Sequence, residues 1–267
     1  MAQTQEHQTD REHAEWKARF LDAQAERGRE RKQRLYALMH VQAGHRALDV
    51  GPGPGTDTIP LARLVGPTGQ VVGLDTDEAM VVEANKRAEE AGVSGWVEHK
   101  VGDASAMPFE DDYFDACHAE RVFMHLVNPE QVSAEMVRET KPAGCIAIVD
   151  VDWATLSIDT PMTDVERRIA SFYAKVHKNP YAGRQLNRFF KQHGLVDISI
   201  DVEPFVGTDL VSVDYFLRLE ERGQKALEAG VVTQDEFERF WSSLEQADAM
   251  GAFFCMGNQV TTIGRKP

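Results

Sequence analysis

The chain has 267 residues, with 29 basic and 43 acidic side chains and a formal net charge of -14 at pH 7. This length suits one larger α/β domain, or one domain with a cap, and leaves ample material for a core. The negative charge repels phosphate backbones, which excludes DNA or RNA as a partner held mainly by electrostatic attraction.

The three cysteines, Cys117, Cys145 and Cys255, are scattered and form no C-x-x-C pair. This spacing argues against a disulfide framework or a zinc site and favours a reducing cytoplasm. No apolar run approaches the ~20 residues that span a bilayer, and the first residues are polar. We therefore expect a cytoplasmic protein with neither a membrane span nor a signal peptide.

Residues 10–39 are dense in Glu, Arg, Lys, Gln and Ala, with a minority of apolar side chains. This composition predicts amphipathic helices. Such helices either pack on the main body as a solvated pair or act as a lid over a bound ligand. We assign residues 1–40 to an N-terminal helical lid and take Tyr36 as a candidate substrate contact.

A short apolar run at residues 47–50 leads into a turn with glycine at every second position, Gly51, Gly53 and Gly55. Glycine allows positive φ and close approach of a ligand, so the pattern predicts a first strand followed by a ligand-binding loop. Asp49, near the end of this strand, is expected to face the ligand.

The glycine spacing argues against a nicotinamide-dependent oxidoreductase. A dinucleotide fingerprint needs glycine at its first, third and sixth positions. Counted from Gly51, the sixth position is Thr56, and counted from Gly53 it is Thr58. Both registers fail.

The pattern Asp49-x-Gly51-x-Gly53-x-Gly55 instead resembles the first motif of class I S-adenosylmethionine-dependent methyltransferases. A glycine-rich turn in another α/β protein is the alternative for this loop alone. The resemblance implies an α/β, Rossmann-like, doubly wound, seven-stranded sheet with an antiparallel last strand, plus helical lid segments. It also implies S-adenosyl-L-methionine as cofactor and no required metal.

The second strand, residues 70–74, is followed by Asp75 and Thr76. In doubly wound folds an acidic residue at this position accepts hydrogen bonds from a ribose diol. Asp75 lies twenty residues after Gly55, close to the spacing expected for that role. The resemblance adds Thr76 to the cofactor site and places Met80 against the adenine, while the acids next to Met80 are equally suited to cap the following helix.

The third strand, residues 96–101, ends in Gly-Asp-Ala. The resemblance implies that the Asp103 carboxylate holds the adenine amino group and that the Ala104 N–H contacts a ring nitrogen. Residues 107–116 resemble the segment that leads into the fourth strand of this family.

The fourth strand, residues 116–119, brings Glu120 and Arg121 to the sheet edge beside the expected methionine part of the cofactor. Residues 122–129 follow as a predicted helix and resemble a segment of ubiquinone/menaquinone-biosynthesis-like methyltransferases. His125 is a candidate general base, since imidazole titrates near neutral pH, with packing and hydrogen bonding as the alternative role.

Residues 141–149 resemble the turn and fifth strand of the same family. Beyond them, Asp152 is a candidate proton acceptor and Trp153 a candidate stacking surface, with a helix cap and a core indole as the alternatives. In the following helices, Tyr173 and Arg184 are candidate substrate contacts. For Arg184 a surface salt bridge is the alternative.

The rest of the chain predicts a sixth strand at 196–202, an acidic helical insertion, and an antiparallel hairpin formed by residues 252–256 and 260–267. We divide the single domain into the lid at 1–40, a cofactor-binding core at 41–151, and insertions at 152–193 and 208–250 that form a substrate cap.

The expected function is methyl transfer from S-adenosyl-L-methionine to an O, N or C atom of a small organic molecule in specialised or quinone-like metabolism, by in-line displacement. The alternatives are a non-catalytic cofactor-binding module and a peptide or protein methyltransferase. No nucleic-acid or membrane partner is expected, and a homodimer is compatible with the sequence.

Overall fold

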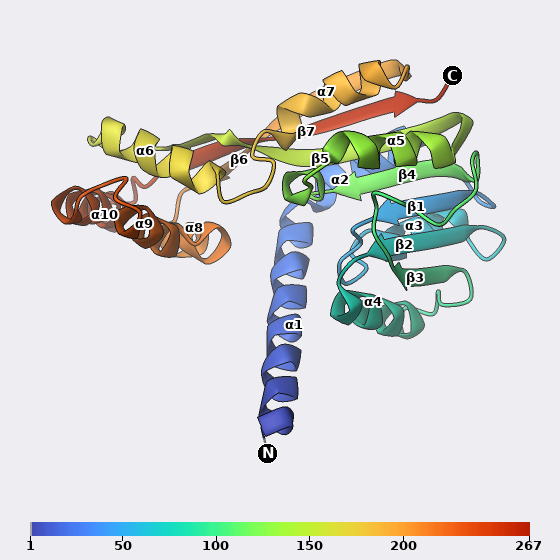
Figure 1. Ribbon diagram of the computed structural model, residues 1–267, viewed down its shortest axis with the longest axis horizontal. Helices are drawn as coiled ribbons and strands as arrows, with labels where there is room; N and C mark the ends of the chain where they lie inside the picture. The colour runs from blue at the N-terminus through green and yellow to red at the C-terminus, as the bar shows by residue number, and fades with distance from the viewer. Residues whose placement is uncertain (1) are drawn as a thin grey trace.

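The computed structural model describes the backbone of residues 2–267 and the side chains of residues 15–267. Its centre is one seven-stranded sheet in the order β3-β2-β1-β4-β5-β7-β6 (Figure 1). The strands are β1 (Arg46–Val50), β2 (Gln70–Asp75), β3 (Val97–Val101), β4 (Phe114–Glu120), β5 (Thr140–Ile158), β6 (Val196–Gly207) and β7 (Cys255–Arg265). Strands β1 to β5 run parallel, and β7 runs antiparallel to both β5 and β6. The predicted fold class, with its antiparallel last strand, is confirmed.

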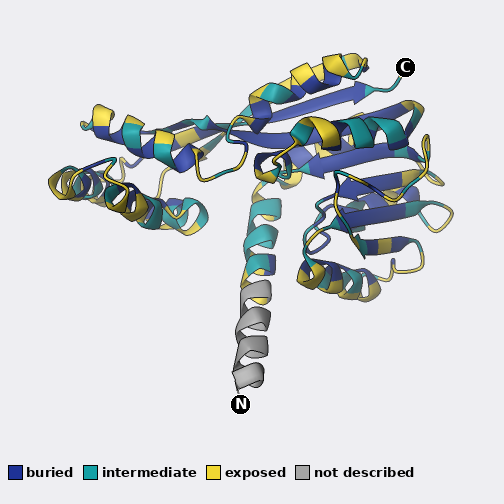
Figure 2. Ribbon diagram, in the orientation of Figure 1, coloured by how far each residue is buried: buried dark blue, intermediate teal, exposed yellow. Residues whose placement is uncertain are grey.

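Helices cover both faces of the sheet (Figure 2). One buried cluster contains apolar side chains of α2 and α3, and a second contains those of α5 to α10. Two clusters form because the strands of a doubly wound sheet are apolar on both faces. The helices are α1 (Ala2–Arg27), α2 (Arg29–Met39), α3 (Thr58–Val65), α4 (Glu78–Glu90), the 3-10 turn η1 (Phe123–His125), α5 (Pro129–Glu139), α6 (Thr163–Ala174), α7 (Ala182–Gln192), α8 (Leu210–Leu217), α9 (Leu219–Glu228) and α10 (Gln234–Ala249).

Three long strands, β5, β6 and β7, extend the sheet beyond its other strands. Strand β5 has 19 residues, whereas β1 to β4 have five to seven. In Figure 1, β5, β6 and β7 continue to the left beyond the other strands, and α6, α8, α9 and α10 lie at this extended end. The sheet itself therefore supports these four helices, which we call the cap.

The lengths of β5 and β6 correct the sequence-based boundaries. Strand β5 does not end at Val149, and β6 does not end at Val202, because each continues to pair with β7. The predicted C-terminal hairpin is also wrong, since its two segments form the single strand β7. Position 257 in this strand requires glycine, because a Cβ there would lie 2.2 Å from the Phe205 ring.

The predicted helix over residues 122–129 is reduced to the single turn η1. Pro129 is the first residue of α5, and a proline disfavours helical geometry in the residue before it. The segment between η1 and α5 is therefore a loop.

Within the part of the chain that the structure describes, no helix combines the length and the apolar character needed to cross a bilayer.

Packing of α7 on β7 generates a stability prediction. The Phe190 ring is fully buried and lies against the backbone of Gly264. We expect Phe190→Ala to lower the free energy of unfolding by about 3–5 kcal/mol, because it removes a buried ring and leaves a cavity. Urea unfolding measures the change. The control Phe254→Ala removes a ring that is 40% exposed and should cost clearly less, and equal losses would contradict the packing described.

Candidate active site

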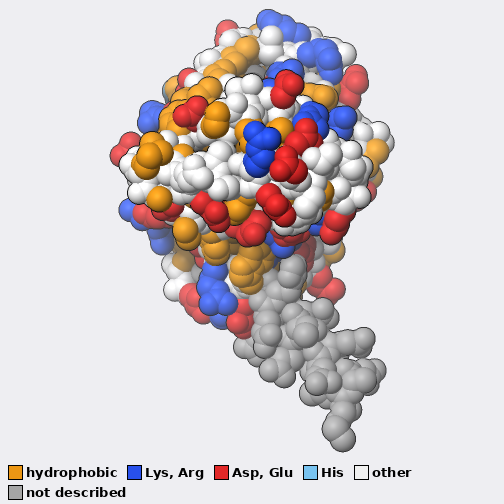
Figure 3. All heavy atoms as spheres, turned by 90° about the vertical axis from the view of Figure 1, so that its left-hand side faces the viewer, with side chains coloured by type: hydrophobic (Ala, Val, Ile, Leu, Met, Phe, Trp, Pro, Cys, Tyr) orange, Lys and Arg blue, Asp and Glu red, His pale blue; other side chains and the backbone are white. Residues whose placement is uncertain are grey.

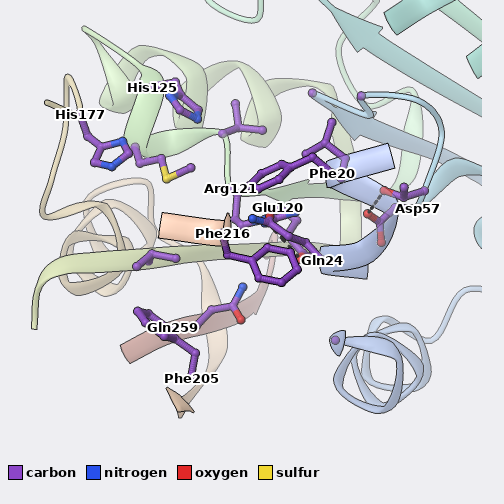
Figure 4. Close-up of a pocket in the computed structure, with 18 of the residues that line it drawn as sticks. Phe20, Gln24, Asp57, Glu120, Arg121, His125, His177, Phe205, Phe216 and Gln259 are labelled. Atoms are coloured by element: carbon purple, nitrogen blue, oxygen red, sulfur yellow. Dashed lines mark hydrogen bonds and ion pairs between the residues drawn. The ribbon is translucent and has the colours of Figure 1, made fainter. Parts of the chain in front are cut away.

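A cavity of about 1650 Å³ opens at the carboxyl edge of the parallel strands. Its walls come from α1 and α2, from the loops after β1, β2, β3 and β4, and from the cap (Figure 4). Open α/β sheets bind ligands at this edge. The cavity exceeds the roughly 300–1000 Å³ typical of a site for one small ligand, so it has room for two.

The glycine loop forms one end of the cavity. Gly51 and Gly53 line it with φ of 67° and 53°. A Cβ on Gly51 would lie 2.4 Å from Val122, so this position requires glycine for both its conformation and its close packing. Gly55 also has positive φ, 86°, but it lies outside the cavity lining and shapes the turn into α3.

The Asp75 carboxylate lies beside this loop and lines the cavity. Its oxygens accept hydrogen bonds from the backbone N–H groups of Gly53 and Asp77, both at 3.0 Å. Each carboxylate oxygen has a second lone pair, so both retain capacity to accept from a ligand. Asp75 therefore fixes the loop and can still bind hydroxyl groups.

The remaining residues predicted for the nucleoside end also line the cavity: Thr76, Met80, Asp103 and Ala104. Met80 is almost fully buried, whereas Asp103 is exposed. A hydrogen bond from the Ser105 backbone N–H to Asp103, 2.8 Å long, lowers the pKa of the Asp103 carboxyl. The carboxylate is thus ionised and accessible at the cavity rim.

Glu120 and Arg121 both line the cavity at the end of β4. Arg121 adopts a positive φ of 57°, unusual for a residue with a side chain, and its Nε is buried without a hydrogen-bond partner among the described residues. Glu120 is held from α2, where Arg31 Nη2 contacts its Oε1 at 2.6 Å and Lys32 Nζ its Oε2 at 2.9 Å. The predicted edge position of both residues is therefore found.

Asp49 does not face the cavity, which corrects its predicted orientation. Its side chain is buried beneath the loop, and its Oδ1 lies 2.8 Å from His118 Nδ1. Burial opposes a charge on His118, but the Asp49 carboxylate raises the pKa of His118 above its ordinary value. Asp49 therefore belongs to the internal structure that supports the loop.

A buried ionic network joins α2 to the glycine loop. Lys32 Nζ lies 2.7 and 2.6 Å from the two oxygens of Asp57, in addition to its contact with Glu120. The Tyr36 hydroxyl donates to Asp57 as well, so Tyr36 is buried behind the cavity and does not face a substrate there. Burial raises the pKa values of Asp57 and Glu120, but Lys32 acts together with other neighbours, His118 and Tyr36 for Asp57 and Arg31 and Arg121 for Glu120. The combined effect holds both pKa values below their ordinary range.

Asp49, Asp57 and His118 also approach one another closely enough to hold a metal ion, with candidate ligand atoms within 4.8 Å. Lys32 already gives Asp57 a positive partner and occupies both of its carboxylate oxygens. A cation would have to displace that ammonium. We therefore assign these residues to the ionic network.

The other end of the cavity is aromatic. Trp153 and Tyr173 line it as predicted, with ring centroids 5.2 Å apart, and His177 stacks on Trp153 at 4.7 Å. A register shift in β5 between Asp152 and Ser157 displaces Trp153 from the regular strand. Such bulges redirect side chains, which gives this indole its place in the cavity wall.

We call this end of the cavity the aromatic chamber. His125 lies in it, with its ring centroid 5.9 Å from that of His177 (Figure 4). Burial, together with Arg121 and other nearby cations, lowers the pKa of His125. Burial and the nearby Arg222 lower the pKa of His177 to about 4. Both rings are therefore neutral at pH 7 and can accept a proton.

Asp152 and Arg184 lie outside the cavity lining. Asp152 is buried and accepts two hydrogen bonds from Arg184, one of them 3.0 Å long. Arg184 therefore forms the salt bridge that was the alternative to its predicted substrate contact, and Asp152 is not positioned to take a proton from a ligand in this cavity.

Several lining residues were missed by the sequence interpretation. Among them are Arg31, Phe205, Arg222 and Gln259. A helical insertion gives no signal in a single sequence for which of its faces will turn inward.

Asp150 was not singled out either, although an acid inside an apolar strand is a usable signal. It is fully buried and accepts hydrogen bonds from the backbone N–H groups of Met124, at 3.2 Å, and Val151, at 2.8 Å. Burial raises the pKa of Asp150 to about 7 despite these bonds. Asp150 therefore holds η1, and with it His125, against β5.

A family described as a methyltransferase domain matches residues 42–194. The chain is 32% identical over 238 residues to the uncharacterized 37.1 kDa protein in transposon TN4556 from Streptomyces fradiae, with 88% of this chain and 67% of that protein covered. It is 37% identical over 113 residues to the ubiquinone/menaquinone biosynthesis C-methyltransferase UbiE from Pseudomonas fluorescens, with 42% and 44% covered. The chain therefore spans less than half the length of that second relative.

Solved structures agree on the fold. The YcgJ protein from Bacillus subtilis superposes with a TM-score of 0.63 at 19% identity, covering 88% of this chain and 97% of that one. Phosphoethanolamine N-methyltransferase 2 from Haemonchus contortus, in complex with phosphomonomethylethanolamine and S-adenosylhomocysteine, gives 0.56 at 20% identity, covering 89% and 53%. The chain belongs to the methyltransferase domain family, within the class I S-adenosylmethionine-dependent methyltransferases.

The ionic network generates a pH-dependent prediction. We expect Lys32→Met to lower the free energy of unfolding at pH 7 by about 3–5 kcal/mol, because it leaves the buried Asp57 and Glu120 carboxylates without their shared partner. In the parent protein these carboxyls have depressed pKa values, so their contribution persists above about pH 4 and is lost only in stronger acid.

In the Lys32→Met variant, burial instead raises the pKa values of the two carboxyls, so they protonate on mild acidification and the deficit should shrink between pH 7 and pH 5. Denaturant unfolding at both pH values measures it. The control Lys86→Met removes a lysine whose side chain is 61% exposed and should change little. A deficit that stays constant or grows toward pH 5 would contradict the network's role.

Proposed function

We propose that the protein transfers a methyl group from S-adenosyl-L-methionine to a small organic molecule. The observation that carries this proposal is the continuity of the cavity, which joins the glycine loop and Asp75 at one end to the chamber around Trp153 and Tyr173 at the other. A methyl donor and an acceptor need such a shared space. Membership of the methyltransferase domain family supports the same function.

The polar groups of the cavity fit the cofactor. Asp75 would accept hydrogen bonds from the ribose hydroxyls, and Asp103 with the Ala104 N–H would bind the adenine, above Met80. Arg31 lines the cavity, and its Nη1 is buried without a hydrogen-bond partner among the described residues. This nitrogen would bind the carboxylate of the cofactor's amino-acid part.

When bound, the cofactor supplies an electrophilic methyl carbon: the acceptor's lone pair forms the new bond while the carbon–sulfur bond breaks and its electrons remain on sulfur. The chain's part is to orient the acceptor in line with that bond and to exclude water. His125 would take the proton released by a hydroxyl or amine acceptor, since its ring is neutral at pH 7, whereas a pKa of about 4 makes His177 a poor base.

Surface charge supports a small acceptor over a polyanion. On the cap face in Figure 3, acidic and basic side chains are interspersed with apolar ones. An extended basic surface, which nucleic-acid binding requires, is not seen among the described side chains of that face. The net charge of -14 points the same way.

Cofactor binding is tested at Asp75. We expect Asp75→Asn to weaken the affinity for S-adenosylhomocysteine at least about tenfold, because a neutral amide is a poorer acceptor for two ribose hydroxyls than a carboxylate. Isothermal titration calorimetry measures the dissociation constant. The control Asp235→Asn changes an exposed acid on α10 and should leave the constant unaltered. Unchanged affinity in Asp75→Asn would exclude the proposed ribose contact.

Transfer is tested with a panel of phenols, organic acids, amines and quinols, with mass spectrometry detecting acceptors that gain one methyl group. For an accepted substrate we expect His125→Gln to lower kcat by tenfold or more, because a proton acceptor is lost, and to leave the affinity for S-adenosylhomocysteine within about twofold. His193→Gln, outside this cavity, is the control.

An unchanged kcat in His125→Gln would assign that ring to packing. Tight cofactor binding by the parent protein without transfer to any member of the panel would instead favour the cofactor-binding module.

A further inference from the structure

Arg222 on α9 lines the cavity, and no carboxylate of the described residues forms an ion pair with it. Its guanidinium lies over the Tyr173 ring, 4.4 Å from the ring centroid. Its Nε and Nη1 are buried and have no hydrogen-bond partner among the residues that the structure describes. Withdrawing a charge and its donors from water without replacing those bonds is unfavourable, so this position indicates a ligand that supplies an anionic group.

The neighbours of Arg222 do not neutralise it. Glu221 is engaged by Arg218 and by Lys225, the latter at 2.6 Å. Burial raises the pKa of Tyr173 to about 12, so its phenol is neutral at pH 7 and offers only a ring face. Arg222 differs in this respect from Arg184, which is paired with Asp152.

Packing of the cap holds Arg222 in place. The next residue, Gly223, lies so close to Phe237 of α10 that a Cβ there would be 2.5 Å from the ring. Phe237 is itself buried. Helix α9 therefore docks on α10 at a defined depth.

The wall around this charge is apolar and aromatic. The Trp153 ring lies 6.1 Å from the tilted Phe205 ring and 4.7 Å from the stacked His177 ring, measured between centroids. Phe216 of α8 and Phe20 of α1, with centroids 5.7 Å apart, belong to the same cavity lining (Figure 4). A flat apolar body fits such a surface, while one positive group fixes its orientation.

We propose that Arg222 binds the carboxylate of the methyl acceptor, so that the acceptor is an organic acid with an aromatic or similarly flat apolar body. This inference rests on the proposed function and specifies the substrate class for the same site. Arg222 would then determine specificity and orientation, while the proton acceptor and the cofactor contacts lie on other elements.

The test compares two probes of the same shape, 2-naphthoate and 2-naphthamide, on protein saturated with S-adenosylhomocysteine. Calorimetry measures both dissociation constants. We expect the carboxylate to bind at least about tenfold more tightly than the amide. Arg222→Gln should abolish this preference, and Arg222→Lys should retain part of it, because lysine keeps the charge but loses the planar donor set.

Arg239→Gln is the matched control, since Arg239 lies on α10 with its side chain 67% exposed and pairs with Asp235. This variant should keep the full preference, and all variants should keep their affinity for S-adenosylhomocysteine. Equal affinities for the two probes in the parent protein, binding of neither, or a preference that survives in Arg222→Gln would overturn the inference. If the parent protein does not bind S-adenosylhomocysteine, that result would instead count against the proposed function.

Discussion

The site depends on the pairing of β5 and β6 with β7. Strand β5 runs from Thr140 to Ile158, and β7 accompanies it on one side while β6 pairs with the other edge of β7. These strands leave the cofactor end of the sheet and reach the helical cap (Figure 1), with one register shift in the β5–β7 pairing between Asp152 and Ser157. One sheet thus fixes the distance between the two halves of the cavity, which a flexible connection could not do.

A second constraint acts from the N-terminal side. Lys32 sits between Asp57 of the glycine loop and Glu120 at the end of β4, so α2 closes over the loop by charge as well as by apolar packing. Removing one of these three side chains would leave buried charge uncompensated, so the ionic network is specific as well as stabilising. Helices α1 and α2 are therefore linked to the loops that line the cavity, α2 through Lys32 and α1 through Lys17 and Asp77.

The sequence predicted the parallel half well because its signals are local. The alternate glycines, Asp75 after β2 and Asp103 after β3 each follow directly from a strand end, and parallel strands bring those ends together. Tyr36, Asp152 and Arg184 were misplaced because the direction of each side chain depends on a distant partner. Arg222 gave no signal, since a basic residue in an acidic helical segment looks solvent-exposed until α9 docks on the rest of the cap.

We propose that one cavity holds the cofactor at the glycine loop and presents its sulfur to the aromatic chamber. A crystal structure of the complex with S-adenosylhomocysteine tests it most directly. We expect ribose oxygens within hydrogen-bonding distance of the Asp75 carboxylate, the adenine beside Asp103, and the sulfur facing Trp153 and Tyr173. A ligand bound elsewhere, or one whose sulfur faces away from that chamber, would contradict it.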